Sequence, residues 1–535
     1  MHANSKLLFK LSFNTITTTT TVIFHRSSLA PNDASPCKIR QLLFSDRSSY
    51  TPAMIISFLL SVLAGIIFVI GLRYGLRLTS CFARCLVRSI PSRYRHSSDP
   101  HDHHVQILVL GDIGRSPRMQ YHAISLAKHG AHVDIVAYKE TARHPDLIGN
   151  PRVSMFALAP QPIWITWGTL PFFINLPAKV IQQFWTLFHT LMYATPPARF
   201  IIIQNPPSIP TFHVALLVSW VRGTKVIVDW HNYGHSILAQ KPLHRPLVPL
   251  YRSYEIWLGR YLGNANLAVT DAMARQLRQG RFKLKNPVFT LHDRPAAIFQ
   301  PLESSSQRLA FLASLPETKR QAQNIVDGTV RLIVSSTSWT ADEDFGMLLD
   351  ALVAYANPEP DSTAEPPSPI LAIITGKGPE KEAYVSKIQE LQDRGRLPGI
   401  RILTAWLSSR AYASLLASAH LGISLHKSTS GVDLPMKVVD MFGAGLPVAA
   451  YSAFESFGEL VKQGENGCGF EDSAQLCQIL MRLFSSQGHG ELERLRLGAI
   501  KEGSLRWDDE WDRVVAPLLG LHGSKIEGKA GLEAH

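Results

Sequence analysis

A twenty-residue stretch, TSGVDLPMKVVDMFGAGLPV (429–448), places charged side chains in a segment that is otherwise apolar enough to be buried. Two carboxylates, Asp433 and Asp440, stand seven residues apart, with Lys437 between them. Pro435 is well placed to open a helix, which puts Lys437 in the first turn and Asp440 one turn further along. A lysine there opposes the helix dipole, so the pattern predicts an anion at the helix start, with Asp440 placed to accept hydrogen bonds from ribose hydroxyls.

A glycine turn that contains a lysine, ITGKGPEKEAY (374–384), predicts a second contact with an anion. The turn follows an apolar run and precedes a helical pattern, so backbone amides and Lys377 would meet a phosphate together. Its spacing is not the GxxxxGK[ST] of a P-loop, which disfavours a P-loop ATPase or kinase.

Two earlier junctions offer candidates for a general base. GDIGRSPRMQYHAISLA (111–127) brings Asp112 to the end of the first apolar run. It lacks the third glycine of a dinucleotide fingerprint, so NAD binding is set aside. In VDWHNYGHS (228–236), Asp229 and His231 leave a strand end together, as a base and its orienting partner would. A purely structural histidine is the alternative.

The composition of the 535-residue chain favours membrane contact, because charged residues make up only 18% and hydrophobic residues 46%. The net charge of +12 is spread out, and no nucleic-acid-binding signature accompanies it. The five cysteines have no regular spacing, which fits a reducing compartment rather than a metal array or a disulfide scaffold.

The run AMIISFLLSVLAGIIFVIGL carries no charge and is long enough to cross a bilayer core of about 30 Å as a helix. We predict a transmembrane anchor at 53–73 and a basic juxtamembrane linker at 74–104. Arginines after the run outnumber the positive charges before it, so the positive-inside rule places the long C-terminal part in the cytosol. Residues 1–52 resemble a transit peptide in composition; the simpler interpretation is a disordered extension, or a chain begun too early, with Met54 as the start.

After the linker, short Val/Ile-rich runs alternate with helix-length segments, which is typical of buried parallel strands. The rhythm restarts part-way, so we predict two successive doubly wound α/β domains, 105–300 and 301–504, then a terminal helix at 505–520 and a tail at 521–535. The runs predicted as strands are 105–110, 132–138, 199–204, 224–230, 266–270, 331–337, 370–376, 400–405, 421–426 and 447–451.

Three segments fall outside this rhythm. NPEPDSTAEPPSP (357–369) predicts an exposed loop. The segment 163–194 is rich in Trp, Phe and Leu, and it fits a buried helix pair or a surface in the membrane interface equally well. The acidic run DDEWD (508–512) is expected to form a solvated helix face.

Several motifs, in the same order along the chain, resemble those of a known family. They are LVLGDIGRSPRMQYHA, QNPPSIP (204–210), DWHNYGHSIL, TSWTADEDFGMLLDAL (337–352), ITGKGP, TAWL (404–407) and HKSTSGVDLPMKVVDMFGAGLPV. Over about 105–470 the chain resembles the eukaryotic chitobiosyldiphosphodolichol β-mannosyltransferases.

The resemblance implies a GT-B fold, with two Rossmann-like domains facing across a cleft. The C-terminal domain would bind GDP-mannose, and the N-terminal domain the lipid-linked acceptor GlcNAc2-diphosphodolichol. The family transfers mannose to the 4-hydroxyl of the distal GlcNAc with inversion, forming a β-1,4 linkage on the cytosolic face of the endoplasmic reticulum membrane. Association with other mannosyltransferases of the pathway is also implied, and no nucleic-acid partner.

The donor-site residues that the resemblance carries over are Ser338, Thr340, Gly376, Lys377, Gly378, Ser430, Gly431, Asp433, Leu434, Met436, Lys437 and Asp440. In related GT-B transferases two glutamates frame a motif like 429–448. Here Asp440 matches one and Asp433 at best the other, so the shorter side chains alter the ribose contact. The family pattern has a small hydroxyl residue where Lys427 stands.

Inversion requires one base to deprotonate the acceptor hydroxyl, and cations and amides to stabilise the departing diphosphate. The candidates for the base are Asp112, which is slightly preferred, and Asp229 or His231; Lys377 and Lys437 would neutralise the diphosphate. No metal cluster of the DxD kind stands out, so we expect no tightly bound cofactor and Mg²⁺ at most as a stimulant. The alternatives are a membrane-anchored scaffold that binds lipid-linked sugars, and a related GT-B enzyme that uses UDP-GlcNAc.

Overall fold

The computed structural model describes residues 103–162, 172–340, 343–358 and 366–521, all within one unit, Leu86–His535. The predicted extension, the anchor and nearly all of the basic linker lie outside the described residues, as does the tail beyond residue 521. Within the described ranges, no helix combines the length and the apolar character that a membrane crossing requires.

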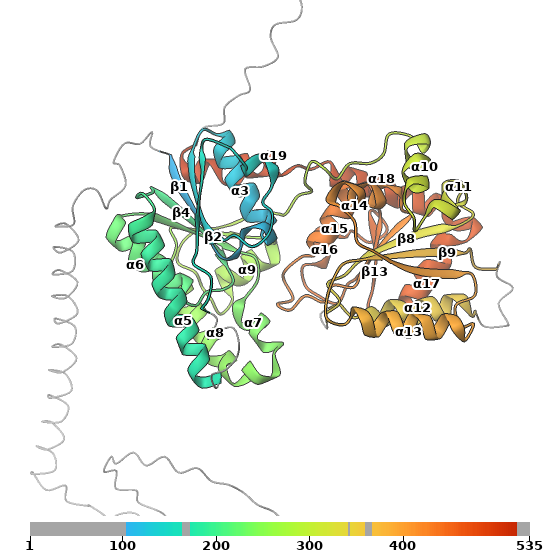
Figure 1. The fold of residues 1–535 in the computed structure, drawn as a ribbon, viewed down its shortest axis with the longest axis horizontal. Helices are drawn as coiled ribbons and strands as arrows, with labels where there is room; N and C mark the ends of the chain where they lie inside the picture. Colours follow the sequence, from blue (N-terminus) through green and yellow to red (C-terminus); the bar gives the residue numbers. More distant parts are fainter. Residues whose placement is uncertain (1–102, 163–171, 341–342, 359–365, 522–535) are drawn as a thin grey trace, which may run out of the picture. The chain divides into compact units, whose positions relative to one another are not determined.

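The first sheet has seven parallel strands in the order β3-β2-β1-β4-β5-β6-β7 (Figure 1). The order reverses between β1 and β4, which is where an open α/β sheet forms a crevice at the carboxyl ends of its strands. The strands are β1 (His104–Asp112), β2 (His132–Tyr138), β3 (Val153–Ala157), β4 (Phe200–Asn205), β5 (Lys225–Trp230), β6 (Ala265–Ala268) and β7 (Val288–Thr290). The α-helices are α3 (Pro117–Lys128), α5 (Phe172–His189), α6 (Thr211–Arg222), α7 (Gly234–Ala239), α8 (Val248–Gly259) and α9 (Asp271–Gln279).

The second sheet has six parallel strands in the order β10-β9-β8-β11-β12-β13, with its own reversal between β8 and β11. Its strands are β8 (Arg331–Ser336), β9 (Ile370–Thr375), β10 (Ile400–Ala405), β11 (Leu421–Ser424), β12 (Val448–Tyr451) and β13 (Gly467–Phe470). Its α-helices are α10 (Ser305–Ser314), α11 (Ala322–Val326), α12 (Phe345–Ala356), α13 (Lys381–Asp393), α14 (Ser409–Ser418), α15 (Met436–Gly443), α16 (Phe457–Leu460), α17 (Ser473–Phe484) and α18 (His489–Gly503).

Strand β4 shows why the apolar runs become strands. Ile201 and Ile203 pack into the core on one face of the first sheet, and Ile202 packs into the core on the other. Because helices cover both faces, every position of such a strand has to be apolar, which produces the continuous Val/Ile runs in the sequence. The predicted doubly wound architecture is therefore present in both halves, and each predicted run coincides with a strand. Strands β3, β7 and β13 were not predicted, because they are short and lack a dense Val/Ile run.

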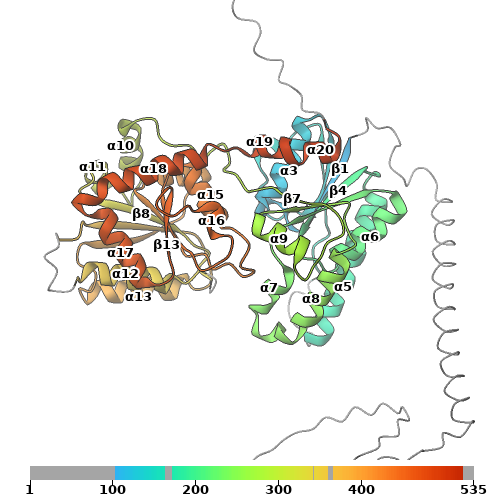
Figure 2. The same cartoon turned by 180° about the vertical axis from the view of Figure 1, so that it is seen from behind.

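The predicted terminal helix at 505–520 is two short helices, α19 (Trp507–Val514) and α20 (Ala516–Leu519). Figures 1 and 2 show α19 lying beside α3, so the end of the chain returns to the first sheet. Trp507 and Trp511 are buried in the same core as Ile107 of β1. This return explains the apolar residues that alternate with acids in the sequence of the helix.

The described part of the segment 163–194 is the helix α5, which a π-helical turn, Thr190–Ala194, follows. Residues 163–171 lie outside the described residues, and the described part contains this one α-helix. Leu187 and Leu191 pack into the core, whereas Ile181 and Trp185 are 69% and 63% exposed. Large apolar side chains therefore remain at the surface of this helix.

Candidate active site

Asp112 is at the end of β1, as predicted, but its carboxylate is engaged by the neighbouring loop. The carboxylate accepts hydrogen bonds from the backbone N–H groups of Glu140 (3.0 Å) and Thr141 (3.3 Å), and also from the Thr141 hydroxyl. Burial raises the pKa of Asp112, yet these hydrogen bonds outweigh burial and lower it. The geometry therefore gives Asp112 the role of fixing the loop and argues against our sequence-based preference for it as the base.

Asp229, at the end of β5, is completely buried and forms a bidentate ion pair with Arg118 of α3. The Arg118 Nε and Nη2 atoms lie 2.9 Å and 3.0 Å from the two carboxylate oxygens. Burial alone would raise the pKa of Asp229, but Arg118 and the nearby His231 hold it well below the usual range. Asp229 is therefore an ionised and inaccessible carboxylate, which suits an orienting residue and not a base.

His231 is the residue that Asp229 orients. Its Nε2 atom lies 2.9 Å from the Asp229 carboxylate, and its side chain is 22% exposed. When Nε2 carries the hydrogen and donates a hydrogen bond to Asp229, the lone pair on Nδ1 is the one that can accept a proton. The two residues thus form the arrangement of a general base and its positioning carboxylate, which the Asp-x-His spacing suggested.

A buried chain of hydrogen bonds supports this pair from behind. The indole Nε1 of Trp511 donates to His122 Nδ1 (3.0 Å), and His122 Nε2 lies 3.1 Å from Asp229. Because an indole N–H only donates, His122 Nδ1 must accept, so His122 Nε2 carries the proton and donates to Asp229. Burial lowers the pKa of His122 and thereby favours this neutral form. The residues Arg118, His122 and Trp511 were not predicted from the sequence.

Arg118 also connects this group to the segment that joins the two sheets. Its Nη1 atom donates to the Leu291 carbonyl oxygen (2.9 Å) and to the Asp293 carboxylate (2.8 Å). Asp293 in turn lies close enough to Asp440 of α15 to contribute, after burial, to a rise in the pKa of Asp440 to about 8. Asp440 is therefore mostly protonated at neutral pH, which suits a group that can donate or accept a hydrogen bond at a ribose hydroxyl.

Helix α15 begins as the sequence predicted, with Pro435 as its N-cap residue and Lys437 in the first turn. The ammonium of Lys437 forms an ion pair with Glu343, a buried residue of the loop that follows β8. Burial raises the pKa of Glu343, but Lys437 outweighs it and the pKa is lowered. Glu343 was not predicted, although it stands within the TSWTADEDFG motif.

The Glu343 carboxylate also fixes the loop that carries Ser338 and Thr340. It accepts hydrogen bonds from the backbone N–H and, at 2.9 Å, from the hydroxyl of Ser338. The Ser338 and Thr340 hydroxyls lie 3.0 Å apart. The structure therefore brings these two predicted donor-site residues into one hydrogen-bonded group with Lys437.

The glycine turn after β9 packs directly on that loop. A Cβ atom on Gly376 would lie 1.8 Å from the Thr337 carbonyl oxygen, and one on Gly378 would lie 1.7 Å from the Ser338 carbonyl oxygen. Both glycines are thus required by the close approach of two loops. Lys377 extends over the exposed ring of Trp406, with its Nζ atom 3.9 Å from the ring centroid, in a cation–π contact.

Asp433 organises its own loop and does not cap helix α15. It accepts a hydrogen bond from Ser430 Oγ (2.7 Å), is also bonded by Ser428, and lies 3.1 Å from His426 Nε2. Burial raises the pKa of Asp433, and these partners overcome burial and lower it. Gly431 has a positive φ of 78°, a conformation that favours glycine. Of the other predicted residues, Met436 is the first residue of α15 and Leu434 packs on the neighbouring core.

Hydrogen bonds join this loop to the loops of the first sheet. Asn232 donates to the Thr429 hydroxyl (3.1 Å), and Thr270 donates to the Val432 carbonyl oxygen (2.6 Å). Asn232 directly follows His231. The candidate base and the predicted donor loop are therefore connected through a single residue.

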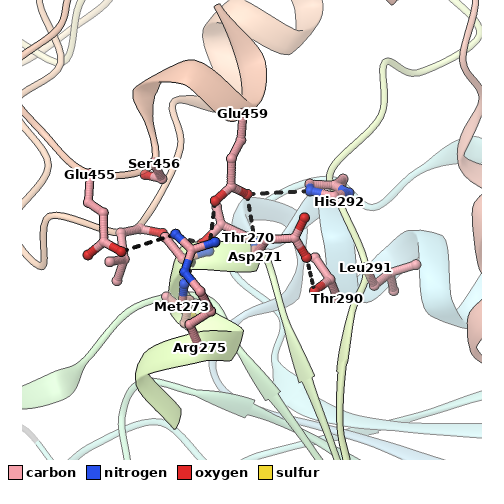
Figure 3. A network of polar contacts seen from close by, with 12 residues as sticks. Thr270, Asp271, Met273, Arg275, Thr290, Leu291, His292, Glu455, Ser456 and Glu459 are labelled. Carbon is pink, nitrogen blue, oxygen red and sulfur yellow. Dashed lines mark hydrogen bonds and ion pairs between the residues drawn. The ribbon is translucent and has the colours of Figure 1, made fainter. Parts of the chain in front are cut away.

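An ion-pair network lies beside the site, and Figure 3 shows the part of it around Asp271, His292 and Glu459. Glu459 accepts hydrogen bonds from the backbone N–H groups of Asp271 (2.6 Å) and Ala272 (2.7 Å), at the start of α9. His292 lies 3.5 Å from Glu459 and 3.0 Å from Glu510 of α19. The hydrogen bonds to these two carboxylates outweigh burial and raise the pKa of His292 to about 9, so it is charged at neutral pH.

This network bears on a possible metal site and on the acidic run 508–512. The potential ligand atoms of Asp271, His292 and Glu459 all lie within 4.8 Å of one another, which is a spacing suited to a metal. Both ring nitrogens of His292 already face carboxylates, and both Glu459 oxygens accept a backbone N–H, so we assign the group to ion pairing. Glu510, within the acidic run 508–512, is buried and also pairs with Arg294 (2.6 Å), which corrects the prediction that this run forms only a solvated face.

Comparisons with known proteins give the class. Residues 114–291 match the family model described as a glycosyl transferase 4-like domain. The fold resembles that of the Anabaena protein HepE in complex with UDP and glucose (TM-score 0.53, 15% identity, 78% of this chain and 99% of that one). It also resembles an α,α-trehalose-phosphate synthase from Burkholderia vietnamiensis (TM-score 0.52, 10% identity, 76% and 98%). The two sheets thus form a GT-B-like fold, and residues 114–291 match a glycosyltransferase domain.

Curated relatives give the family. The chain is 43% identical over 453 residues to the chitobiosyldiphosphodolichol beta-mannosyltransferase of Arthroderma benhamiae, covering 83% of this chain and 98% of that protein. It is 39% identical to the human protein of that name, over 78% and 92%. The chain therefore belongs to the chitobiosyldiphosphodolichol β-mannosyltransferase family. A further relative, from Arabidopsis thaliana, is named UDP-glycosyltransferase TURAN and is 38% identical over 77% and 96%.

The substitution Trp511→Phe tests the buried support of His231. It keeps the aromatic bulk and removes the N–H that fixes the His122 tautomer, so we expect kcat for glycosyl transfer to fall about tenfold with little change in KM. We also expect the acidic limb of the pH–rate profile to shift. The matched control is Trp507→Phe on the same helix, because Trp507 donates to Ser125, outside the chain of hydrogen bonds. Equal effects of the two substitutions would contradict the assignment.

The substitution Asp440→Asn tests the raised pKa of Asp440. The folded protein retains a proton that the unfolded chain releases, so the carboxyl destabilises the fold increasingly as the pH rises from 3.8 to about 8. We expect Asp440→Asn to raise Tm by about 3 °C or more at pH 8, and by less at pH 5, in calorimetry. The control Asp393→Asn changes an exposed carboxylate on α13 and should have an equally small effect on Tm at both pH values. A gain that does not depend on pH would contradict the prediction.

Proposed function

We propose that this chain transfers mannose from GDP-mannose to GlcNAc2-diphosphodolichol, forming a β-1,4 linkage with inversion. The observation that carries the proposal is the His231–Asp229 pair, which Asn232 connects to the loop that begins helix α15. The names of the chitobiosyldiphosphodolichol beta-mannosyltransferases that the chain resembles support this choice of sugar and acceptor.

In the proposed reaction, His231 Nδ1 takes the proton of the acceptor 4-hydroxyl as the oxygen attacks the anomeric carbon of mannose. The bond between that carbon and the diphosphate oxygen breaks, and GDP leaves from the opposite face. Lys437, which forms an ion pair with Glu343 in this structure, stabilises the negative charge of the leaving diphosphate at the start of α15. Lys377 contributes a second cation from the turn after β9.

Three further parts of the proposal concern cofactors, location and partners. The residues described above supply a base and cations, so we propose that the reaction needs no tightly bound cofactor and that Mg²⁺ at most stimulates it. The predicted anchor at 53–73 and the arginines after it support a location in the endoplasmic reticulum membrane, with the catalytic body facing the cytosol. The acceptor is itself a membrane lipid. Association with other mannosyltransferases of the pathway remains a proposal that rests on the family.

The activity is tested with the purified full-length chain, chitobiosyl-diphosphate-phytanyl as acceptor, and either GDP-mannose or UDP-GlcNAc as donor. We expect transfer only from GDP-mannose, with a product that β-mannosidase digests and with activity retained in EDTA. His231→Ala should lower kcat by about 10²-fold or more, because a positioned base contributes that much. Transfer from UDP-GlcNAc would instead favour the second candidate, which the name of the Arabidopsis relative suggests. Acceptor binding without transfer would favour a scaffold.

The role of Lys437 is tested by Lys437→Ala. Loss of the cation should raise KM for GDP-mannose about tenfold and leave KM for the acceptor within twofold, because a charged hydrogen bond to the diphosphate is lost. The control Lys387→Ala removes an exposed lysine of α13 and should change neither value. An unchanged KM for GDP-mannose in Lys437→Ala would remove Lys437 from the donor site.

A further inference from the structure

A large cavity opens in the first domain, and the start of helix α7 lines it. Its volume is about 650 Å³, within the range of small-molecule sites, and it lies among α5, α7, α8 and the 3-10 helix η5 (Pro242–Leu247). Leu110 of β1, Pro206 and Pro207 line it, so it lies at the carboxyl ends of β1 and β4. This is the edge of the sheet at which α/β proteins bind ligands.

The walls of the cavity are mostly apolar, and its charged groups share one sign. Leu176 and Val180 of α5 face Ile237 of α7 across it. Lys179 and Lys241 also line it, and no aspartate or glutamate is present among the described residues that do so. Both lysines are exposed, so their ammonium groups remain hydrated and available to an anion at the rim. Such a site is complementary to a ligand with an apolar chain and an anionic group.

The outer faces of the same helices expose large apolar side chains. Ile181 on α5 is 69% exposed, Leu243 on η5 is 69% exposed, and Leu250 on α8, which also lines the cavity, is 72% exposed. Exposed apolar side chains on the helices that form a cavity are suited to contact with lipid. An apolar chain that leaves the cavity here would pass directly into a hydrophobic environment.

Helix α7 connects the lining of the cavity to the residue proposed as the base. Gly234, the first residue of α7, lines the cavity and lies three residues after His231. Its backbone N–H donates to the buried carboxylate of Glu255 (2.9 Å), which also accepts a hydrogen bond from Asn205 (3.1 Å) and so fixes this junction. The end of the cavity at Gly234 is therefore only three residues along the chain from the residue proposed as the base.

We propose that this cavity binds the isoprenoid diphosphate of the acceptor. Lys179 and Lys241 meet the diphosphate, the first isoprene units occupy the apolar walls, and the chain leaves past Ile181 and Leu250 into the membrane. The two sugars then extend from the diphosphate towards His231. This inference rests on the proposed function for the identity of the acceptor, but the cavity itself can be tested without any sugar.

The first experiment measures binding to the full-length chain in detergent by the change in intrinsic fluorescence. Farnesyl diphosphate is expected to bind at least tenfold more tightly than either inorganic diphosphate or farnesol, because only it offers both the charge and the chain. The double substitution Lys179→Glu/Lys241→Glu should weaken that binding at least tenfold, and so should Val180→Asp in the apolar wall. The control Lys387→Glu/Lys501→Glu makes the same change of charge on exposed lysines of α13 and α18 and should bind as the parent does.

The second experiment separates the inference from the proposed function. In the transfer assay, the lysine double substitution should raise KM for the phytanyl acceptor at least tenfold and leave KM for GDP-mannose within twofold. Val180→Asp should raise KM for the phytanyl acceptor more than for one with a short alkyl chain. The cavity assignment would be overturned if the lysine double variant and Val180→Asp both bound farnesyl diphosphate as the parent does and both kept its KM values, with an unchanged Tm. Tight binding of farnesyl diphosphate by a parent that transfers no mannose would instead overturn the proposed function alone.

Discussion

The ion pair between Arg118 and Asp229 is the contact on which the arrangement of the candidate site depends. Both side chains are withdrawn from water, and such a pair stabilises a fold only if its geometry is good and its remaining hydrogen-bonding atoms are satisfied. Here the guanidinium engages the carboxylate with two nitrogens, and its remaining donors reach Leu291 and Asp293. Asp229 is left with the negative charge that orients His231.

This requirement brings distant parts of the chain together. Arg118 belongs to α3, Asp229 to β5 and Asp293 to the segment between the two sheets, whereas Trp511 comes from α19 at the end of the chain. The return of α19 to the first sheet is therefore more than a way to bury two tryptophans. It supplies the donor that determines which nitrogen of His122 carries the proton. Removing any member would leave a buried polar atom without a partner, which is costly in a dry interior.

In the part of the site that the second domain supplies, carboxylates also hold the loops in place. Glu343 and Asp433 each fix one loop by accepting hydrogen bonds from hydroxyls and, for Glu343, from a backbone amide. Lys437 balances the charge of Glu343, and His426 lies 3.1 Å from the Asp433 carboxylate. Asp440 differs, since burial and the nearby Asp293 raise its pKa and no cation among the described residues forms an ion pair with it. A strained electrostatic position of this kind is typical of a residue kept for a ligand.

The sequence by itself determined the architecture, because strands covered on both faces must be continuously apolar and their runs are legible one after another. It also determined the helix that Pro435 begins and the pairing of Asp229 with His231, which are local in the chain. Only the tertiary structure shows that the Asp112 carboxylate is engaged, because the amides that bond to it come from residues 140 and 141, and for this reason His231 is the residue that we propose as the base. The reason for Gly376 and Gly378 also emerges only from the tertiary structure. Their pattern suggested a phosphate site, and the structure shows that a side chain at either position would collide with the carbonyl oxygen of Thr337 or Ser338. Contacts between residues far apart in the chain leave no periodic signal, so they emerge only when the chain is folded.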